Sequence, residues 1–178
     1  LQGGLGEDTI DGSDGNDQID GGSGNDIIFG GAGGDHITVD GNGGIDSVDG
    51  GEGSDTLVLN RGGLVGITIS IADPNILQTL EDGTTLINFE QLIFTGSFVN
   101  DFVRGGALRD ILHGSDGDDI IEGGAGDDSL NGGAGFDALN YFNSSTGVTI
   151  DLLQNIATGG DATGDSFIFF EDVYGSAH

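Results

Sequence analysis

Hydrophobic residues recur along most of the chain as single aliphatic side chains, nine positions apart, separated by stretches of glycine and aspartate. The clearest stretch is 114–140, where three consecutive units each carry Gly first and fourth, Asp sixth, and Ile or Leu eighth. Glycine reaches positive φ at little cost and lets backbone segments approach closely, so it suits a tight turn. The pattern predicts that each unit is a six-residue turn followed by a three-residue strand whose middle side chain points inward.

The same period extends over eleven units, with the sixth-position aspartate as its marker. In every unit this Asp is preceded by Gly five positions earlier and followed by Ile, Leu or Val two positions later. The eleven aspartates are Asp8, Asp17, Asp26, Asp35, Asp46, Asp55, Asp101, Asp110, Asp119, Asp128 and Asp137. Val99 and Leu108 replace the second glycine in two units, and the fourth unit carries two extra residues, Val39 and Asp40. We expect a bulged turn and one disrupted site at this insertion. Two units would form a coil with two parallel strands facing each other across a thin core.

The units form two blocks, each followed by a segment that departs from the period. We expect a first block of six units at 1–58, a flanking β segment at 59–95 and a second block of five units at 96–140, the first two degenerate. A second flanking segment at 141–178 ends in the opening of a further repeat. Period-two alternation over 65–71 and an apolar run over 86–94 predict strands in the first flank.

Two short motifs recur in both flanks. They are Gly-(Ile/Val)-Thr-Ile, beginning at Gly66 and Gly147, and Phe-Glu-x-(Leu/Val), beginning at Phe89 and Phe170. Six of the ten phenylalanines also lie in the flanks: Phe89, Phe94, Phe142, Phe167, Phe169 and Phe170. We expect them to form a more ordinary packed core that caps the ends of the blocks.

The charge of the chain excludes several classes of function. It carries a formal charge of −28, with 31 acidic residues, three arginines and no lysine. Nucleic acids and anionic membrane surfaces are bound chiefly through cationic side chains, so we expect no nucleic-acid partner. No run of 18 apolar residues is present, so we expect no membrane insertion. Without cysteine there is no disulfide or thiolate metal site. Neither Gly-x-Ser-x-Gly nor His-Glu-x-x-His occurs, and we predict that the chain is not an enzyme.

Composition instead favours a cation as the partner. Each unit orders nine residues but buries only one aliphatic side chain, which does not offset the lost backbone entropy. Calcium is held by about six to eight oxygen atoms from carboxylates and backbone carbonyls. A glycine-rich turn with one aspartate offers this type of ligand. The free energy of binding would then stabilise the fold.

These units resemble the RTX, or hemolysin-type, calcium-binding nonapeptide repeats of secreted bacterial proteins. The resemblance covers 3–58 and 96–140. It implies an all-β fold, a right-handed parallel β-roll (β-solenoid) in two repeat blocks with intervening and carboxy-terminal β-rich flanking segments. It also implies that each calcium lies between the turns of units n and n+2. The ligands carried over are the eleven aspartates and the backbone carbonyls of the turns at Gly3, Gly12, Gly21, Gly30, Gly41, Gly50, Gly105, Gly114, Gly123 and Gly132. Such pairing allows four sites in the first block and three in the second, about seven Ca²⁺ ions in all.

The resemblance also implies a role. The chain would be a calcium-binding module of a larger secreted bacterial protein, exported by type I secretion and folded by calcium outside the cell. It would stabilise or space the covalently linked neighbouring domains. A second hypothesis is a calcium-dependent polysaccharide-binding module, similar to the repeat modules of alginate epimerases, or an adhesin segment. An exposed basic or aromatic strip would favour that hypothesis.

Overall fold

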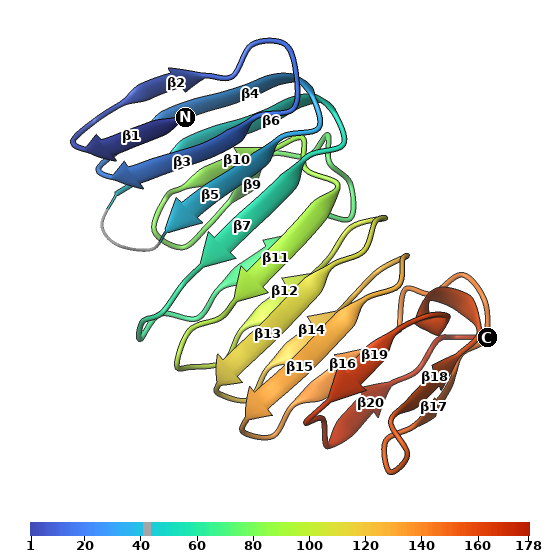
Figure 1. The fold of residues 1–178 in the computed structure, drawn as a ribbon. Helices are drawn as coiled ribbons and strands as arrows, with labels where there is room; N and C mark the ends of the chain where they lie inside the picture. Colours follow the sequence, from blue (N-terminus) through green and yellow to red (C-terminus); the bar gives the residue numbers. More distant parts are fainter. Residues whose placement is uncertain (41–43) are drawn as a thin grey trace.

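The chain folds into short β-strands that alternate between two facing layers, shown in Figure 1. The computed structural model describes residues 1–40 and 44–178. One layer is an eight-stranded sheet that runs the length of the molecule, and the other consists of two five-stranded sheets, one opposite each half. The predicted all-β class with parallel strands is confirmed.

The long sheet, sheet A, takes strands from both repeat blocks and from both flanks. All of its neighbouring strands are parallel. In spatial order it contains β1 (Gln2–Leu5), β3 (Gln18–Ser23), β5 (His36–Asp40), β7 (Thr56–Asn60), β11 (Gln91–Thr95), β13 (Ile111–Asp116), β15 (Ser129–Ala134) and β19 (Ser166–Ile168).

Sheet B lies opposite the first half of sheet A, and sheet C opposite the second half. Sheet B contains β2 (Thr9–Asp11), β4 (Ile27–Gly33), β6 (Ser47–Gly53), β10 (Thr85–Ile87) and β9 (Gln78–Thr79), and only the β9–β10 pair is antiparallel. Sheet C contains β20 (Asp172–Tyr174), β16 (Ala138–Asn140), β14 (Ile120–Glu122), β12 (Phe102–Arg104) and β8 (Thr68–Ser70), all parallel. Outside these sheets, β17 (Thr149–Asp151) and β18 (Ile156–Thr158) form an antiparallel pair, followed by a 3-10 helix at Gly160–Ala162. Within the described residues, no helix is long and apolar enough to cross a lipid bilayer.

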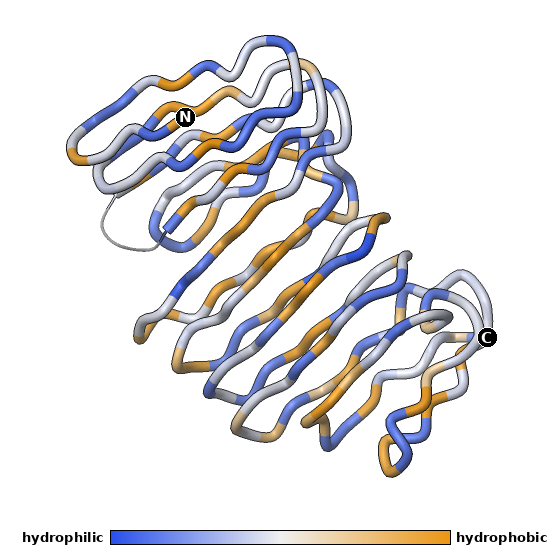
Figure 2. The backbone as a smooth tube through the Cα atoms, viewed as in Figure 1, coloured by the Kyte–Doolittle hydropathy of each residue, from blue (hydrophilic) through white to orange (hydrophobic). Residues whose placement is uncertain are grey.

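Within the repeat blocks, neighbouring strands of a sheet come from repeat units that are two apart in the sequence. Ile10 pairs with Ile28 in sheet B, and Leu112 pairs with Leu130 in sheet A. In β4, Ile28 is 1% exposed, whereas its neighbours Ile27 and Phe29 are 44% and 45% exposed. The eighth-position residue is buried in all eleven units, and Figure 2 shows hydrophobic positions recurring along the strands between more polar turns. The prediction of an inward-pointing middle side chain is confirmed.

The turns bring the backbones of successive coils into direct contact. Gly31 and Gly133 both have a φ of 111°, a conformation that L side chains rarely adopt. A Cβ at either position would also collide with a carbonyl oxygen one coil away, that of Ser13 or Ser115. Conformation and close approach together therefore require glycine in these turns.

The two extra residues of the fourth unit lie in a strand, so the bulged turn expected at these positions is wrong. Val39 and Asp40 extend β5 and pair with Leu59 and Asn60 of β7. Because β7 is equally long, the insertion gains a second inward position, and Val39 is 2% exposed. Residues 41–43, which follow, lie outside the described part of the chain.

The flanks continue the sheets of the repeat blocks. Strand β10 pairs with β6, while β11 pairs with β7 of the first block and β13 of the second. The strand predicted over 86–94 is divided into β10 and β11 at Asn88, which has a φ of 60°. The strand predicted over 65–71 is confirmed only at β8, between the buried Ile67 and Ile71.

The flank phenylalanines divide into two groups. Phe89, Phe94, Phe167 and Phe170 are buried, and the rings of the last two pack edge to face with centroids 6.4 Å apart. Phe142 and Phe169 are 64% and 62% exposed, so the expectation of a core role is wrong for them. Both lie in irregular backbone outside the strands.

We predict that Ile28→Ala destabilises the protein by about 2–5 kcal/mol, because it removes a fully buried side chain from the thin core. Ile27→Ala on the same strand is the matched control and should change the free energy of unfolding by less than about 1 kcal/mol. Urea denaturation of both variants under identical conditions measures the difference. Equal losses would contradict the assignment of the inward face.

Candidate metal centre

All eleven repeat aspartates lie directly before a strand. Because the strands of each sheet are parallel and in register, the aspartates of successive coils stack in columns at one end of the sheet. The sheet A column holds Asp17, Asp35, Asp55, Asp110 and Asp128, the sheet B column Asp8, Asp26 and Asp46, and the sheet C column Asp101, Asp119 and Asp137. Nine of the eleven are buried, and the other two, Asp8 and Asp17, are half-buried. Buried carboxylates are rare unless they are paired or coordinate a metal.

In nine of the eleven aspartates, all but Asp8 and Asp17 of the first coil, one carboxylate oxygen accepts a backbone N–H from the preceding coil. The N–H of Asp35 donates to Oδ1 of Asp55, and that of Asp119 to Oδ1 of Asp137, both at 2.8 Å. The same bond joins Asp8 to Asp26, Asp17 to Asp35, Asp26 to Asp46, Asp101 to Asp119, and Asp110 to Asp128. These bonds fix the orientation of the carboxylates and leave the second oxygen of each for another role.

The other carboxylate oxygen, Oδ2, is buried and unsatisfied in most of the repeat aspartates. Within the described residues, Oδ2 has no hydrogen-bond partner in Asp8, Asp17, Asp35, Asp55, Asp119, Asp128 and Asp137. A buried polar atom without a partner destabilises a protein, and a charged one does so more strongly. Seven such atoms in equivalent positions indicate a group that binds there.

Carbonyl oxygens of the next coil lie beside these free carboxylate oxygens. A Cβ at Gly30 would collide with the carbonyl oxygen of Gly50, and a Cβ at Gly114 would collide with that of Gly132 and with Oδ2 of Asp119. Six of the predicted glycines place their carbonyls in this way: Gly21, Gly30, Gly50, Gly114, Gly123 and Gly132. Gly3, Gly12 and Gly105 instead lie opposite such a carbonyl oxygen, and a Cβ at any of them would collide with it. Gly41 lies outside the described residues.

The resulting donor set is made of oxygen alone. In the described part of the chain no three Asp, Glu or His side chains converge on one point, so a metal must also draw ligands from the backbone. One or two carboxylate oxygens with carbonyls suit a hard cation such as calcium, which accepts a flexible number of oxygen ligands. The residues present therefore fit a calcium ion.

The two degenerate units satisfy their carboxylates differently. Oδ2 of Asp101 accepts the N–H of Ser97 at 2.8 Å, and Oδ2 of Asp110 accepts the N–H of Gly106 at 2.7 Å. The hydroxyl of Ser97 also donates to Oδ1 of Asp101 at 2.9 Å. Local backbone donors thus occupy the oxygens that are free in the regular units.

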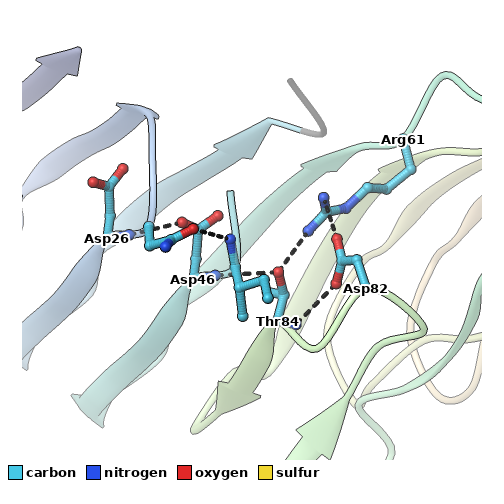
Figure 3. Close-up of polar contacts among 7 residues, drawn as sticks. Asp26, Asp46, Arg61, Asp82 and Thr84 are labelled. Carbon is cyan, nitrogen blue, oxygen red and sulfur yellow. Dashed lines mark hydrogen bonds and ion pairs between the residues drawn. The ribbon is translucent and has the colours of Figure 1, made fainter. Parts of the chain in front are cut away.

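A protein cation lies at the end of the sheet B column, as Figure 3 shows. Asp46 donates its N–H to the Thr84 hydroxyl at 3.3 Å, so Thr84 takes the place of the next carboxylate. The buried Arg61 donates to the same hydroxyl at 3.4 Å and pairs with Asp82 at 2.9 Å.

Three further acidic residues, not predicted from the sequence, belong to the columns of sheets A and C. Glu90 accepts the N–H of Asp55 at 2.8 Å, Glu171 that of Asp137 at 2.9 Å, and Asp165 that of Asp128 at 2.9 Å. Each lies two positions before an apolar residue of a strand, Leu92, Val173 and Phe167 respectively, which is the spacing of the repeat aspartates. An acidic residue at that spacing, without the glycines, is the signal that would have found them.

Several aspartates of the columns have a raised pKa. Burial is the main cause of the raised pKa of Asp119, about 7, and the carboxylates of Asp101 and Asp137 add to it. Burial also raises the pKa of Asp110 and Asp128 to about 7 and that of Asp55 to about 6. Without a bound cation, protons compete for these sites near neutral pH.

Comparison with protein families identifies the repeats. The model of the RTX calcium-binding nonapeptide repeat (4 copies) matches residues 2–37, 38–63 and 104–139, together more than half of the chain. A search of curated proteins returned no match.

We predict that the calcium-free protein loses stability as the pH rises from about 4 to 7. The folded pKa values lie above the value of about 3.9 for an unfolded aspartate, so the folded state binds more protons in this window. Far-UV circular dichroism of resin-stripped protein at pH 5 and pH 8 should show the larger β-sheet signal at pH 5.

Asp119→Asn should reduce this pH dependence, because it removes one of the raised groups. Asp116→Asn, at an exposed position of β13, is the control for the loss of one charge and should leave the dependence nearly unchanged. An equal effect of both substitutions would show that net charge, and not the buried column, sets the pH response.

Proposed function

The chain belongs to the family of RTX calcium-binding nonapeptide repeats, and we propose from this premise that calcium ions held between successive coils fold it. RTX repeats bind Ca²⁺, so the chain is a calcium-binding module. The observation that carries the proposal is the set of seven buried Oδ2 atoms without a hydrogen-bond partner in the described residues. Bound calcium supplies positive charge to these oxygens, and the free energy of binding then contributes to folding.

We propose that the carboxylate ligands are among the eleven predicted aspartates. Those whose Oδ2 makes no hydrogen bond contribute most to calcium binding. The seven with a free Oδ2 are the principal ligands, together with the turn carbonyls that approach them. Asp26 and Asp46 complete the sheet B column. Asp101 and Asp110 use both oxygens in hydrogen bonds and contribute least. The number of ions therefore falls below the seven that simple pairing of repeat units allows.

The two layers are proposed to form a right-handed parallel β-roll. Chain segments alternate between sheet A and the facing sheets, and neighbouring parallel strands are two units apart, as a roll requires. The two repeat blocks and the two flanks are its four segments, at 1–58, 59–95, 96–140 and 141–178. The flanks supply both its larger aromatic core and strands that continue the layers.

The biological role proposed is that of a structural module outside the cell. RTX repeat proteins are typically extracellular bacterial proteins, and the family is generally structural and not catalytic. A chain with a formal charge of −28 repels itself when calcium is scarce and becomes compact when calcium is abundant. This supports export in an unfolded state by type I secretion, followed by folding that stabilises or spaces a parent protein.

We predict that calcium induces β-structure cooperatively in stripped protein, whereas magnesium at the same concentration does not. Magnesium requires near-octahedral geometry at about 2.0–2.1 Å and retains its water ligands, which an adaptable carboxylate and carbonyl set does not replace well. Far-UV circular dichroism during titration of each metal measures the response. A spectrum already folded without calcium, and unchanged by its addition, would sink the proposal.

A second candidate function, binding of polysaccharide, is favoured by one surface. Phe102, Phe142 and Tyr174 are 39%, 64% and 45% exposed and border a shallow cavity of about 370 Å³ beside sheet C. Asn140 and Asn143 line the same cavity, with their side-chain amides already hydrogen-bonded to Glu122. Aromatic faces beside hydrogen-bonding groups suit the apolar faces and hydroxyls of sugars.

Affinity electrophoresis in calcium through gels containing neutral or acidic polysaccharide tests this candidate. If it is correct, Phe142→Ala combined with Tyr174→Ala reduces retention by about fivefold or more, which is roughly 1 kcal/mol of lost binding. Phe29→Ala, which removes an equally exposed ring from sheet B, is the control and should retain the wild-type mobility shift. Absence of retention for the wild type in every polysaccharide would exclude the function.

A further inference from the structure

The last aspartates of the two repeat blocks, Asp55 and Asp137, have no following repeat unit. Each is 0% exposed, and Oδ2 of each lacks a hydrogen-bond partner within the described residues. In the regular part of each block, as at Asp35 and Asp119, the next coil of the same block supplies both an aspartate and a glycine carbonyl. For Asp55 and Asp137 these groups must come from the flanks.

A flank glutamate takes the place of the missing aspartate in both blocks. The N–H of Asp55 donates to Oε2 of Glu90 at 2.8 Å, and the N–H of Asp137 donates to Oε2 of Glu171 at 2.9 Å. Between regular units, the N–H of Asp35 makes the equivalent bond to Asp55 at 2.8 Å. The carboxylate ladder therefore continues one coil beyond the repeats.

A flank carbonyl takes the place of the missing glycine carbonyl. A Cβ at Gly50 would collide with the carbonyl oxygen of Asn88 and would lie 3.0 Å from Oδ2 of Asp55. At Gly132 it would collide with the carbonyl oxygen of Phe169 and would lie 2.8 Å from Oδ2 of Asp137. The same pair of oxygens, carbonyl and free carboxylate, thus occurs in the regular units and at both block ends.

The backbone is held in an unfavourable conformation at both of these carbonyls. Asn88 has a φ of 60° and Phe169 a φ of 59°, in the left-handed region that non-glycine residues adopt infrequently. The ring of Phe169 is 62% exposed, so burial of its side chain does not explain the conformation. Strained backbone that recurs at equivalent positions of two separate segments indicates a functional requirement.

The last aspartate of each block in the other layer or sheet, Asp46 in the first block and Asp128 in the second, lacks this combination. After Asp46 the next group is the Thr84 hydroxyl, beside the guanidinium of Arg61. After Asp128 it is Asp165, whose Oδ2 accepts the Tyr141 hydroxyl at 2.7 Å. The three atoms nearest to a Cβ at Gly123 all belong to Asp128, and no carbonyl of the next coil is among them.

We propose that the segments 88–90 and 169–171 each replace one coil of a repeat and complete a calcium site, with Asp55 and Asp137 respectively. This inference rests on the proposed function, because it assumes that the regular units bind calcium. It adds two sites to those that pairing of repeat units provides, with Glu90 and Glu171 as carboxylate ligands and the carbonyls of Asn88 and Phe169 as backbone ligands. The two flanks therefore contribute to metal binding as well as to the core.

The test counts calcium ions in the full chain by equilibrium dialysis with elemental analysis, for the wild type, Glu90→Gln and Glu171→Gln. Glutamine keeps a side-chain oxygen that can accept the N–H of Asp55 or Asp137 but removes the charge. Each variant should bind one calcium fewer than the wild type, and the double variant two fewer. Glu52→Gln, at an exposed position of β6, is the control and should bind the wild-type number.

The outcomes separate this inference from the proposed function. If the wild type binds several ions and both glutamine variants bind the same number, the glutamates are only structural and the inference is overturned, while the proposed function survives. If the wild type binds none, the proposed function itself fails. If the glutamine variants do not fold, Glu90→Asp and Glu171→Asp decide the question. Each should bind the full number with one ion at least about tenfold weaker, and unchanged affinities would overturn the inference.

Discussion

The stacking of identical charges in register is the constraint on which the rest of this structure depends. Parallel strands about 4.8 Å apart place the same side chain of each unit beside its counterpart, so one aspartate per repeat becomes a column of carboxylates. Burial at the turns removes most of the water that would screen them. In most of these groups one oxygen is satisfied by a backbone N–H of the preceding coil, and in the regular units the second requires a cation or a proton. The glycine turns follow from the same constraint, because only a backbone without side chains leaves the carbonyls of one coil beside the carboxylates of another.

The regular part of the fold could be predicted from the sequence because each unit encodes its own geometry. The aliphatic residue at the eighth position fixes the inward face, and the aspartate two positions earlier fixes the start of the strand. Ile28 and Asp26 illustrate both rules. The pairing of units two apart follows, since a chain that alternates between two layers returns to the same layer every second unit. The prediction failed at Val39 and Asp40, where two extra residues lengthen a strand because its neighbour β7 has inward room for a second side chain.

The groups that follow the last repeat aspartates of each block could not be predicted in the same way. They come from flank segments whose position beside the aspartates is not encoded in the repeat. Three chemistries are found there: a hydroxyl with an arginine at Thr84, a glutamate at Glu90 and Glu171, and an aspartate bound to a tyrosine at Asp165. The repeated Phe-Glu motif is a weak signal for the glutamates, because a recurring phenylalanine is equally explained by a position in the core. The two copies of the other recurring motif adopt different structures. Its first copy forms β8 in sheet C, whereas its second copy forms β17, which pairs only with β18.

The continuity of sheet A through the first flank has a consequence for how the two blocks communicate. Strand β11 is hydrogen-bonded on one edge to β7 of the first block and on the other to β13 of the second. In a stacked array, stability is a sum of terms for single layers and terms for contacts between neighbours. Here the neighbour term is unbroken across the non-repetitive segment, so order that begins in either block can spread into the other. We therefore expect the chain to behave as one linear cooperative lattice, with a steeper response to a ligand than two half-length lattices joined by a flexible tether.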